Sequence, residues 1–335
     1  MRNRSKFHTV RVGALVATLL AAAAIPSLNA SGAPPATGAT LLASGIDDLT
    51  NPGTTIGPDG ELYVTQGASG SIARVDRQTG AITPFADGLP PAVFPVGGVA
   101  DVKFVHGTAY AIVTIVGADV GGSSTVGLYR LDGPSTWSVV ADIGQWSIDN
   151  PSPSDVFIPS GVQYALDFQQ GRFLVTDGHH NRVLAVTLDG QISEVLSFDN
   201  VVPTGLETRG HTTIVALAGP VPHVPEDGMA VVSTKHAPDP TMVANGARLL
   251  VDVEYGPGGT LFGLSQGYFE PGHEEGSPAN PDTGALMYAD SDGTFRTALD
   301  GLDRPTSFEI VGNTAYVATL DGEIWQIDHL ERSTR

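Results

Sequence analysis

The sequence predicts an all-β protein built from one four-stranded unit that recurs along the chain. The clearest copy is Ser160–Phe198, where β-favouring runs at 163–168, 172–176, 183–187 and 192–198 are separated by short polar joints. Turn-forming residues are frequent throughout, with 41 glycines and 24 prolines. An antiparallel four-stranded unit that returns about every 40 to 65 residues is typical of a β-propeller, a ring of such sheets called blades.

Six units account for most of the chain. They are Asn51–Leu89, Gly97–Ile143, Ser160–Phe198, Val202–Ala247, Leu249–Leu302 and Arg304–Leu330. The last unit ends after its third strand, and a strand-like segment without a partner, Thr40–Ser44, precedes the first unit. We therefore expect a six-bladed propeller in which Thr40–Ser44 completes the last blade, which closes the ring and leaves no open edge. An irregular array of β-sandwiches is the alternative architecture.

The first 30 residues have the pattern of an export signal. Four basic residues precede the apolar run Val12–Ile25, and small residues follow it up to Ala30. The run has ~14 residues, fewer than the ~20 of a membrane-spanning helix, although a membrane anchor is the alternative. We expect cleavage after Ala30 or Ala33 and a secreted, extracellular protein. The expected organisation is a signal over 1–30, a linker over 31–40, the propeller over 41–330 and a tail over 331–335.

Charge and cysteine content exclude several classes of function. The formal charge is −19, and removal of the first 30 residues, which hold four basic residues and no acid, changes it to −23. This excess argues against nucleic acid and anionic membranes as partners. A solvated acidic surface explains it, and a cationic partner is the alternative. The absence of cysteine excludes disulfides, a lipid-modified cysteine and a thiol nucleophile. We expect a monomer with no membrane insertion after signal cleavage.

Residues near the start of each inner strand would line the mouth of the central channel. They are Asn51, Asp101, Tyr164, Thr204, Asp252 and Thr306. Asp101 and Asp252 belong to the second and fifth units, which lie opposite each other in a six-fold ring. Two opposed carboxylates can hold Ca²⁺ or another divalent ion, and the alternative is that they cap backbone amides. No other cofactor is expected.

Charged residues also recur at a second position of the inner strands. Apolar residues flank each of Lys103, Asp167, Glu254 and Glu309. Buried charges must be paired or hydrated. We therefore expect an ion-pair network in the channel.

The densest polar loop is Asp177–Arg182. A carboxylate beside a histidine can orient the imidazole as a base or a metal ligand. This makes His179 and His180 the best candidates for catalysis, and Asp177, Asn181 and Arg182 candidates for ligand binding. Hydrogen bonding within a tight turn is the structural alternative. The acidic loops 223–227 and 270–282 are candidates for calcium or are simply solvated.

Several short segments, in their order, carry a family resemblance. They are 42–46, 56–65, 100–102, 127–132, 175–178, 181–184 and 202–205. Together they resemble the ScyD/ScyE family of secreted bacterial propellers over most of residues 41–330. The resemblance implies a six-bladed propeller and an exported protein, and it implies no particular reaction.

Gluconolactonase-like and strictosidine-synthase-like propellers are more distantly similar, through the Leu-Tyr-Val strand that follows Pro-Asp-Gly at 58–60. In the lactonases a Pro-Asn-Gly segment supplies a calcium ligand, and here Thr204 stands in the place of that asparagine. Virginiamycin-lyase-like propellers use a channel-face histidine, for which His179 or His180 would be the counterpart.

Two functions from different classes follow. The sequence contains no Gly-x-Ser-x-Gly elbow and no phosphate loop. It therefore favours a propeller that binds a small molecule or a protein partner on the face that carries its long loops, such as 117–125 and 267–284. The alternative is a metal-assisted hydrolase or lyase, similar to a lactonase, with its site at the channel mouth.

Overall fold

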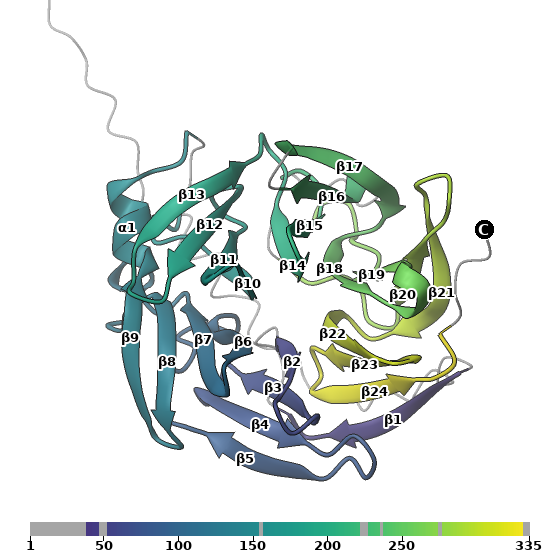
Figure 1. The fold of residues 1–335 in the computed structure, drawn as a ribbon, viewed down its shortest axis with the longest axis horizontal. Helices are drawn as coiled ribbons and strands as arrows, with labels where there is room; N and C mark the ends of the chain where they lie inside the picture. The colour runs from purple at the N-terminus through teal and green to yellow at the C-terminus, as the bar shows by residue number, and fades with distance from the viewer. Residues whose placement is uncertain are drawn as a thin grey trace, which may run out of the picture. The chain divides into compact units, whose positions relative to one another are not determined.

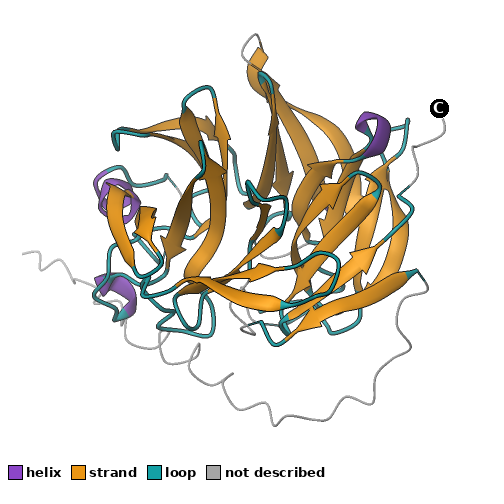
Figure 2. Ribbon diagram, turned by 60° about the horizontal axis from the view of Figure 1, so that its bottom comes forward, coloured by secondary structure: helices purple, strands orange, loops and turns teal. Residues whose placement is uncertain are grey.

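The structure is a computed structural model that describes residues 38–46, 52–153, 157–221, 227–234, 237–273 and 277–330. Within these ranges, six four-stranded antiparallel sheets are arranged as blades around a common axis (Figure 1). Strands make up most of the described chain, and the helices are short (Figure 2). The predicted six-bladed β-propeller is confirmed.

The first three blades follow the chain from the inner strand to the outer strand. Blade 1 consists of β2 (Thr54–Ile56), β3 (Leu62–Gln66), β4 (Ser71–Val75) and β5 (Ile82–Ala86). Blade 2 consists of β6 (Gly98–Val105), β7 (Thr108–Thr114), β8 (Gly127–Gly133) and β9 (Thr136–Asp142). Blade 3 consists of β10 (Gln163–Gln169), β11 (Arg172–Asp177), β12 (Arg182–Thr187) and β13 (Ile192–Ser197).

The last three blades complete the ring. Blade 4 consists of β14 (Pro203–Arg209), β15 (Thr212–Leu217), β16 (Gly228–Thr234) and β17 (Ala237–Ala247). Blade 5 consists of β18 (Leu250–Tyr255), β19 (Leu261–Ser265), β20 (Gly284–Ala289) and β21 (Phe295–Leu302). Blade 6 consists of β22 (Pro305–Val311), β23 (Thr314–Thr319), β24 (Glu323–Ile327) and β1 (Ala39–Ser44). The inner strands contact one another in the order β2, β6, β10, β14, β18, β22 and back to β2.

The outer strand of blade 6 comes from the other end of the described chain. β1 pairs antiparallel with β24, and the amides of Gly45 and Ile46 both donate to the carbonyl of Gly322, at 3.0 and 3.1 Å. The segment Thr40–Ser44 therefore lies beside β24. Its contribution to the integrity of the ring is a prediction, tested below by deletion.

The hydrophobic core lies between neighbouring blades. The second and third strands of each blade are covered on both faces, so they read as continuous apolar runs, as in β11 and β12. Aromatic rings join the blades. Tyr63 and Phe104 pack edge to face at 4.7 Å across blades 1 and 2, and Tyr110 and Phe173 pack in a tilted arrangement at 4.8 Å across blades 2 and 3. This packing fixes the inner strands around the channel.

A short helix interrupts the connection from blade 2 to blade 3, and the strand pattern did not predict it. Helix α1 (Ile143–Asp149) begins where the Asp142 carboxylate accepts the amide of Gln145 at 2.8 Å. It ends at Asn150, directly before Pro151, which disfavours helical backbone in the residue that precedes it. In the described ranges no helix is long and apolar enough to cross a membrane. The predicted signal (1–30), most of the linker and the tail (331–335) lie outside the described residues.

Candidate functional site

A β-bulge recurs in the inner strands at the level of the channel. The register between first and second strands shifts in blades 2 to 6, between Val99 and Asp101 in β6 and between Leu250 and Asp252 in β18, for example. A bulge adds a residue on one strand and changes the direction of the side chains that follow. Asp101 and Lys103 follow the bulge on β6 and are two residues apart, so they share one face of the strand and both line the channel.

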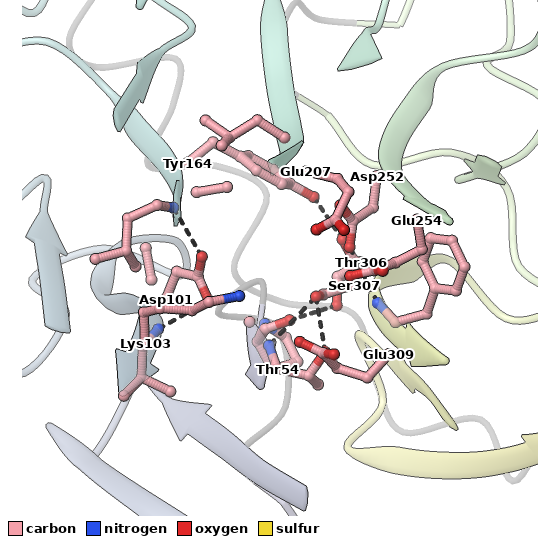
Figure 3. A pocket seen from close by; sticks show the side chains of 18 residues that line it. Thr54, Asp101, Lys103, Tyr164, Glu207, Asp252, Glu254, Thr306, Ser307 and Glu309 are labelled. Carbon is pink, nitrogen blue, oxygen red and sulfur yellow. Dashed lines mark hydrogen bonds between the residues drawn. The ribbon is translucent and has the colours of Figure 1, made fainter. Parts of the chain in front are cut away.

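Inner-strand segments from all six blades line a cavity at the centre of the ring (Figure 3). The volume of this cavity is about 30 Å³, room for about two water-sized groups. The lining carries one amino group, from Lys103, and five carboxyl groups, which differ from the predicted set in that Glu207 is present and Asp167 is not. The five are Asp101, Glu207, Asp252, Glu254 and Glu309.

Asp101 and Asp252 lie in the cavity wall, where they join neighbouring blades. One oxygen of each accepts the amide of the following residue, and the other accepts an amide from the next blade: Leu166 at 2.8 Å for Asp101 and Phe308 at 3.1 Å for Asp252. Glycine at 205 permits this arrangement, because a Cβ there would collide with the Asp252 carboxyl. Burial raises the pKa of Asp101 well above its usual range and that of Asp252 to about 7, although these amide bonds act in the opposite direction. This geometry matches the alternative in which the two carboxylates cap backbone amides.

Lys103 forms the ion pair that the repeat predicted. Its Nζ lies 2.9 Å from Oδ1 of Asp167, on the next blade. The second oxygen of Asp167 accepts the amide and the hydroxyl of Thr208, at 2.9 and 2.6 Å. Burial alone would lower the pKa of Lys103, but the nearby charges of Asp167 and Glu309 raise it, so the amine stays protonated. The one lysine of the cavity is therefore already paired.

Three glutamates in the lining have no cationic side chain of their own. Burial raises the pKa of Glu309 to about 7, and burial with repulsion from Asp167 does the same for Glu207. Burial, followed by repulsion from Glu309 and Glu207, holds the pKa of Glu254 well above its usual range. Glu207 is not among the residues predicted from the sequence, although it occupies in β14 the position of Glu254 in β18, two residues after the bulge.

The remaining predicted mouth residues also connect blades. The hydroxyl of Thr204 donates to the carbonyl of Leu250 at 2.9 Å, and that of Thr306 to the carbonyl of Pro52 at 2.7 Å. The phenol of Tyr164 donates to the carbonyl of Thr306 at 2.9 Å. Of these residues, Tyr164 and Thr306 line the cavity. Asn51 lies outside the described residues.

The polar cluster around Asp177 lies apart from this cavity and is buried. Oδ2 of Asp177 is 2.7 Å from Nδ1 of His180 and accepts Nε of Arg182 at 3.2 Å. The other guanidinium nitrogens of Arg182 donate to the carbonyl of Asn150 and to the Ser147 hydroxyl, both at 2.9 Å. The side chains of Asp177, His180 and Arg182 are at most 2% exposed. The cluster therefore clamps α1 and the chain that follows it onto blade 3.

His179 and Asn181 serve the same region. Nε2 of His179 accepts the amides of Phe157 and Ile158, at 3.1 and 3.2 Å, and burial lowers its pKa. Asn181 has a φ of 54°, and its carbonyl accepts the amide of Phe198 at 2.8 Å. Neither histidine lines the cavity. Catalysis by His179 or His180 stays a prediction, and this geometry favours the structural alternative.

The structure contains no preformed cluster of metal ligands among the residues it describes. In those ranges no group of three or more histidine, aspartate or glutamate side chains is placed to hold an ion. Binding of a divalent ion between Asp101 and Asp252 therefore stays a prediction. Four residues of the two acidic loops, His223, Glu226, Glu274 and Glu275, lie outside the described residues.

Solved structures with the same architecture include enzymes of three kinds. A gluconolactonase from Xanthomonas campestris matches with a TM-score of 0.58 at 12% identity, over 87% of this chain and 89% of that one. A PQQ-bound aldose sugar dehydrogenase from Streptomyces coelicolor matches with 0.55 at 14% identity, over 88% and 99%. Virginiamycin B lyase from Staphylococcus aureus matches with 0.54 at 14% identity, over 87% and 98%.

At these identities the likeness shows the fold alone. It confirms the expected distant relation to six-bladed propellers of the gluconolactonase and virginiamycin-lyase type at the level of architecture. No protein-family model and no curated protein sequence matches the chain. Membership of the ScyD/ScyE family therefore stays an expectation.

Proposed function

We propose that this protein is an exported propeller that binds a small cationic ligand in its central cavity. The observation that carries the proposal is the cavity itself, in which polar groups from six inner strands surround a volume of about 30 Å³. Sites for whole drug-sized ligands measure roughly 300–1,000 Å³, so this cavity has room for one small charged group such as a primary ammonium, and not for a large ligand. A propeller places such a site where every blade contributes to it.

The charge of the lining decides the class of ligand. Lys103 is neutralised by Asp167, which leaves five carboxyl groups facing the cavity without a cationic side chain of their own. An anion would face repulsion from these groups, and a cation would offset their mutual repulsion. The raised pKa values of Glu207, Asp252 and Glu309, about 7 each, indicate that protons take this role when no ligand is bound.

An organic ammonium fits the arrangement better than a bare divalent ion. Calcium needs six to eight oxygen ligands at about 2.3–2.6 Å, and no such convergence occurs among the described side chains. An ammonium donates hydrogen bonds singly and can use carboxyl groups that are spread around a ring. The Tyr164 ring in the lining adds an aromatic surface for the cation.

Isothermal titration calorimetry of residues 31–335 tests the proposal. The probes are 1,4-diaminobutane, CaCl₂ and sodium sulfate at constant ionic strength. We expect saturable binding of the diamine that E309Q weakens about tenfold or more, the effect of removing one charged hydrogen-bond partner. The matched control is D300N, since Asp300 is an exposed carboxylate on β21. Binding of sulfate alone, or equal loss in both variants, would contradict the proposal, and saturable Ca²⁺ binding without diamine binding would favour a metal site.

A lactonase-like hydrolase or lyase is the second candidate. It is supported by the architecture shared with the gluconolactonase and the lyase. A further support is that Glu207 and Glu309, with pKa values of about 7, are suited to proton transfer near neutral pH. Hydrolysis of simple lactones by residues 31–335 that is lost in E309Q, and kept in D300N, would favour this candidate over binding alone.

A further inference from the structure

One side chain spans the central channel and forms a hydrogen bond with the opposite blade. Tyr164 lies on β10 in blade 3, and its phenol donates to the carbonyl of Thr306 on β22 in blade 6, at 2.9 Å. In the cyclic order of inner strands, β10 and β22 lie opposite each other. Figure 3 shows the Tyr164 side chain reaching across the channel toward Thr306. The residue therefore connects two blades that share no edge.

The ring of Tyr164 also packs on the far side of the channel. It contacts the hydrophobic cluster of blades 5 and 6, which includes Val251 and Phe308. Along its own strand, Tyr164 precedes Asp167 by three residues, or about 10 Å at 3.3 Å per residue. The tyrosine thus lies near the end where the inner strands begin, and the ion pair of Lys103 lies deeper.

We propose that Tyr164 is a gate that controls access to the acidic cavity from this end of the channel. The inference rests on the proposed function, because it concerns access to the same site. In the closed state the phenol is held by the Thr306 carbonyl and its ring covers the lining beneath. Rotation of the side chain breaks that bond and frees a path for a small cation, while the backbone of both blades stays in place.

A chain without cysteine permits a direct test, because an introduced thiol is the only one present. Ser307 lines the cavity and follows Thr306 on β22, so S307C places a thiol in the lining beside the gate. The probes are two methanethiosulfonates, one with a trimethylammonium group and one with a sulfonate group. Their rates of reaction are measured in the S307C background with Tyr164, with Y164F and with Y164A.

If Tyr164 is the gate, Y164F speeds the reaction about fivefold, the factor for a net hydrogen-bond contribution of ~1 kcal/mol. Y164A speeds it further because the ring itself is gone. The control thiol is S291C, at an exposed turn, which should react at one rate in all three backgrounds. Equal rates for S307C in all three backgrounds, within about twofold, would overturn the proposal and indicate access from the opposite face.

The two probes separate this inference from the proposed function. Preference for the trimethylammonium reagent over the sulfonate reports the acidic cavity, and dependence on residue 164 reports the gate. Rates that depend on residue 164 but show no charge preference would support the gate and contradict cation binding. Rates that show a charge preference but do not depend on residue 164 would support cation binding and contradict the gate. If S307C fails to fold, A165C offers a second thiol in the lining.

Discussion

Replacement of Lys103 by methionine is the perturbation whose effect can best be worked out from the structure. Its Nζ lies 2.9 Å from Asp167, which is 6% exposed. Removal of one partner of a buried ion pair costs about 3–5 kcal/mol, because the other charge stays buried. The Lys103 side chain is 29% exposed, so solvent screens part of this interaction. We expect the free energy of unfolding to fall by about 2–3 kcal/mol at pH 7.5.

The loss should depend on pH. Glu207 and Glu309 have pKa values of about 7, so both are largely protonated at pH 5 and the cavity then holds fewer negative charges. At pH 5 we expect K103M to cost about 1 kcal/mol less than at pH 7.5, because fewer carboxylates then repel the unpaired Asp167. The assay is urea unfolding followed by fluorescence of the three tryptophans, at both pH values.

A surface ion pair supplies the matched control. Arg130 and Asp132 are 2.7 Å apart, but their side chains are 49% and 36% exposed. R130M should cause no measurable loss, because exposed pairs contribute little. If K103M and R130M had equal effects, or if the K103M loss were the same at pH 5 and pH 7.5, the account of a charged, buried cavity would be wrong.

Three further predictions concern the whole fold. The pKa values of Glu207, Asp252 and Glu309 are about 7 in the folded state, above the value of ~4 for unfolded chains. Between pH 4 and 7 the folded state therefore binds more protons than the unfolded state. Stability should therefore fall as pH rises through that window, and a urea midpoint that rises instead would refute this. Deletion of residues 38–46 removes β1 and exposes the edge of β24, and it should lower the free energy of unfolding by about 3–5 kcal/mol. Aggregation through the exposed edge should also increase light scattering. An unchanged melting temperature would refute ring closure by β1. D177N leaves buried Arg182 with only the more distant carboxylate of Glu194, at 3.7 Å, and should cost about 3 kcal/mol in urea unfolding. A loss below ~1 kcal/mol would argue against the clamp.

Local patterns were enough to predict the fold. Short β-favouring runs, Asp-Gly turns and the missing fourth strand of the last unit each depend on a few neighbouring residues. The same periodicity aligned Lys103 with Asp167 on consecutive blades, and the structure confirms their ion pair. Glu207 could have been found in the same way, because it holds the equivalent position in the fourth unit.

The site depended on contacts that no local pattern encodes. Tyr164 and Thr306 are 142 residues apart and meet because their blades are opposite in the ring. The partners of Asp101 and Asp252 are set by bulges that turn each carboxyl toward the next blade. The polar loop around Asp177 was a candidate for catalysis and ligand binding. Helix α1, which the strand pattern did not predict, covers the loop, and its Ser147 hydroxyl accepts a hydrogen bond from Arg182.

Proton release on ligand binding tests the central claim most directly. At pH 7 the groups Glu207, Asp252 and Glu309 are each about half protonated, and a bound cation lowers their pKa values. Titration of residues 31–335 with 1,4-diaminobutane in a pH-stat at pH 7 should release on the order of one proton for each molecule bound, and almost none at pH 9. Binding that releases no proton at pH 7, or an absence of binding, would contradict a cation site in the central cavity.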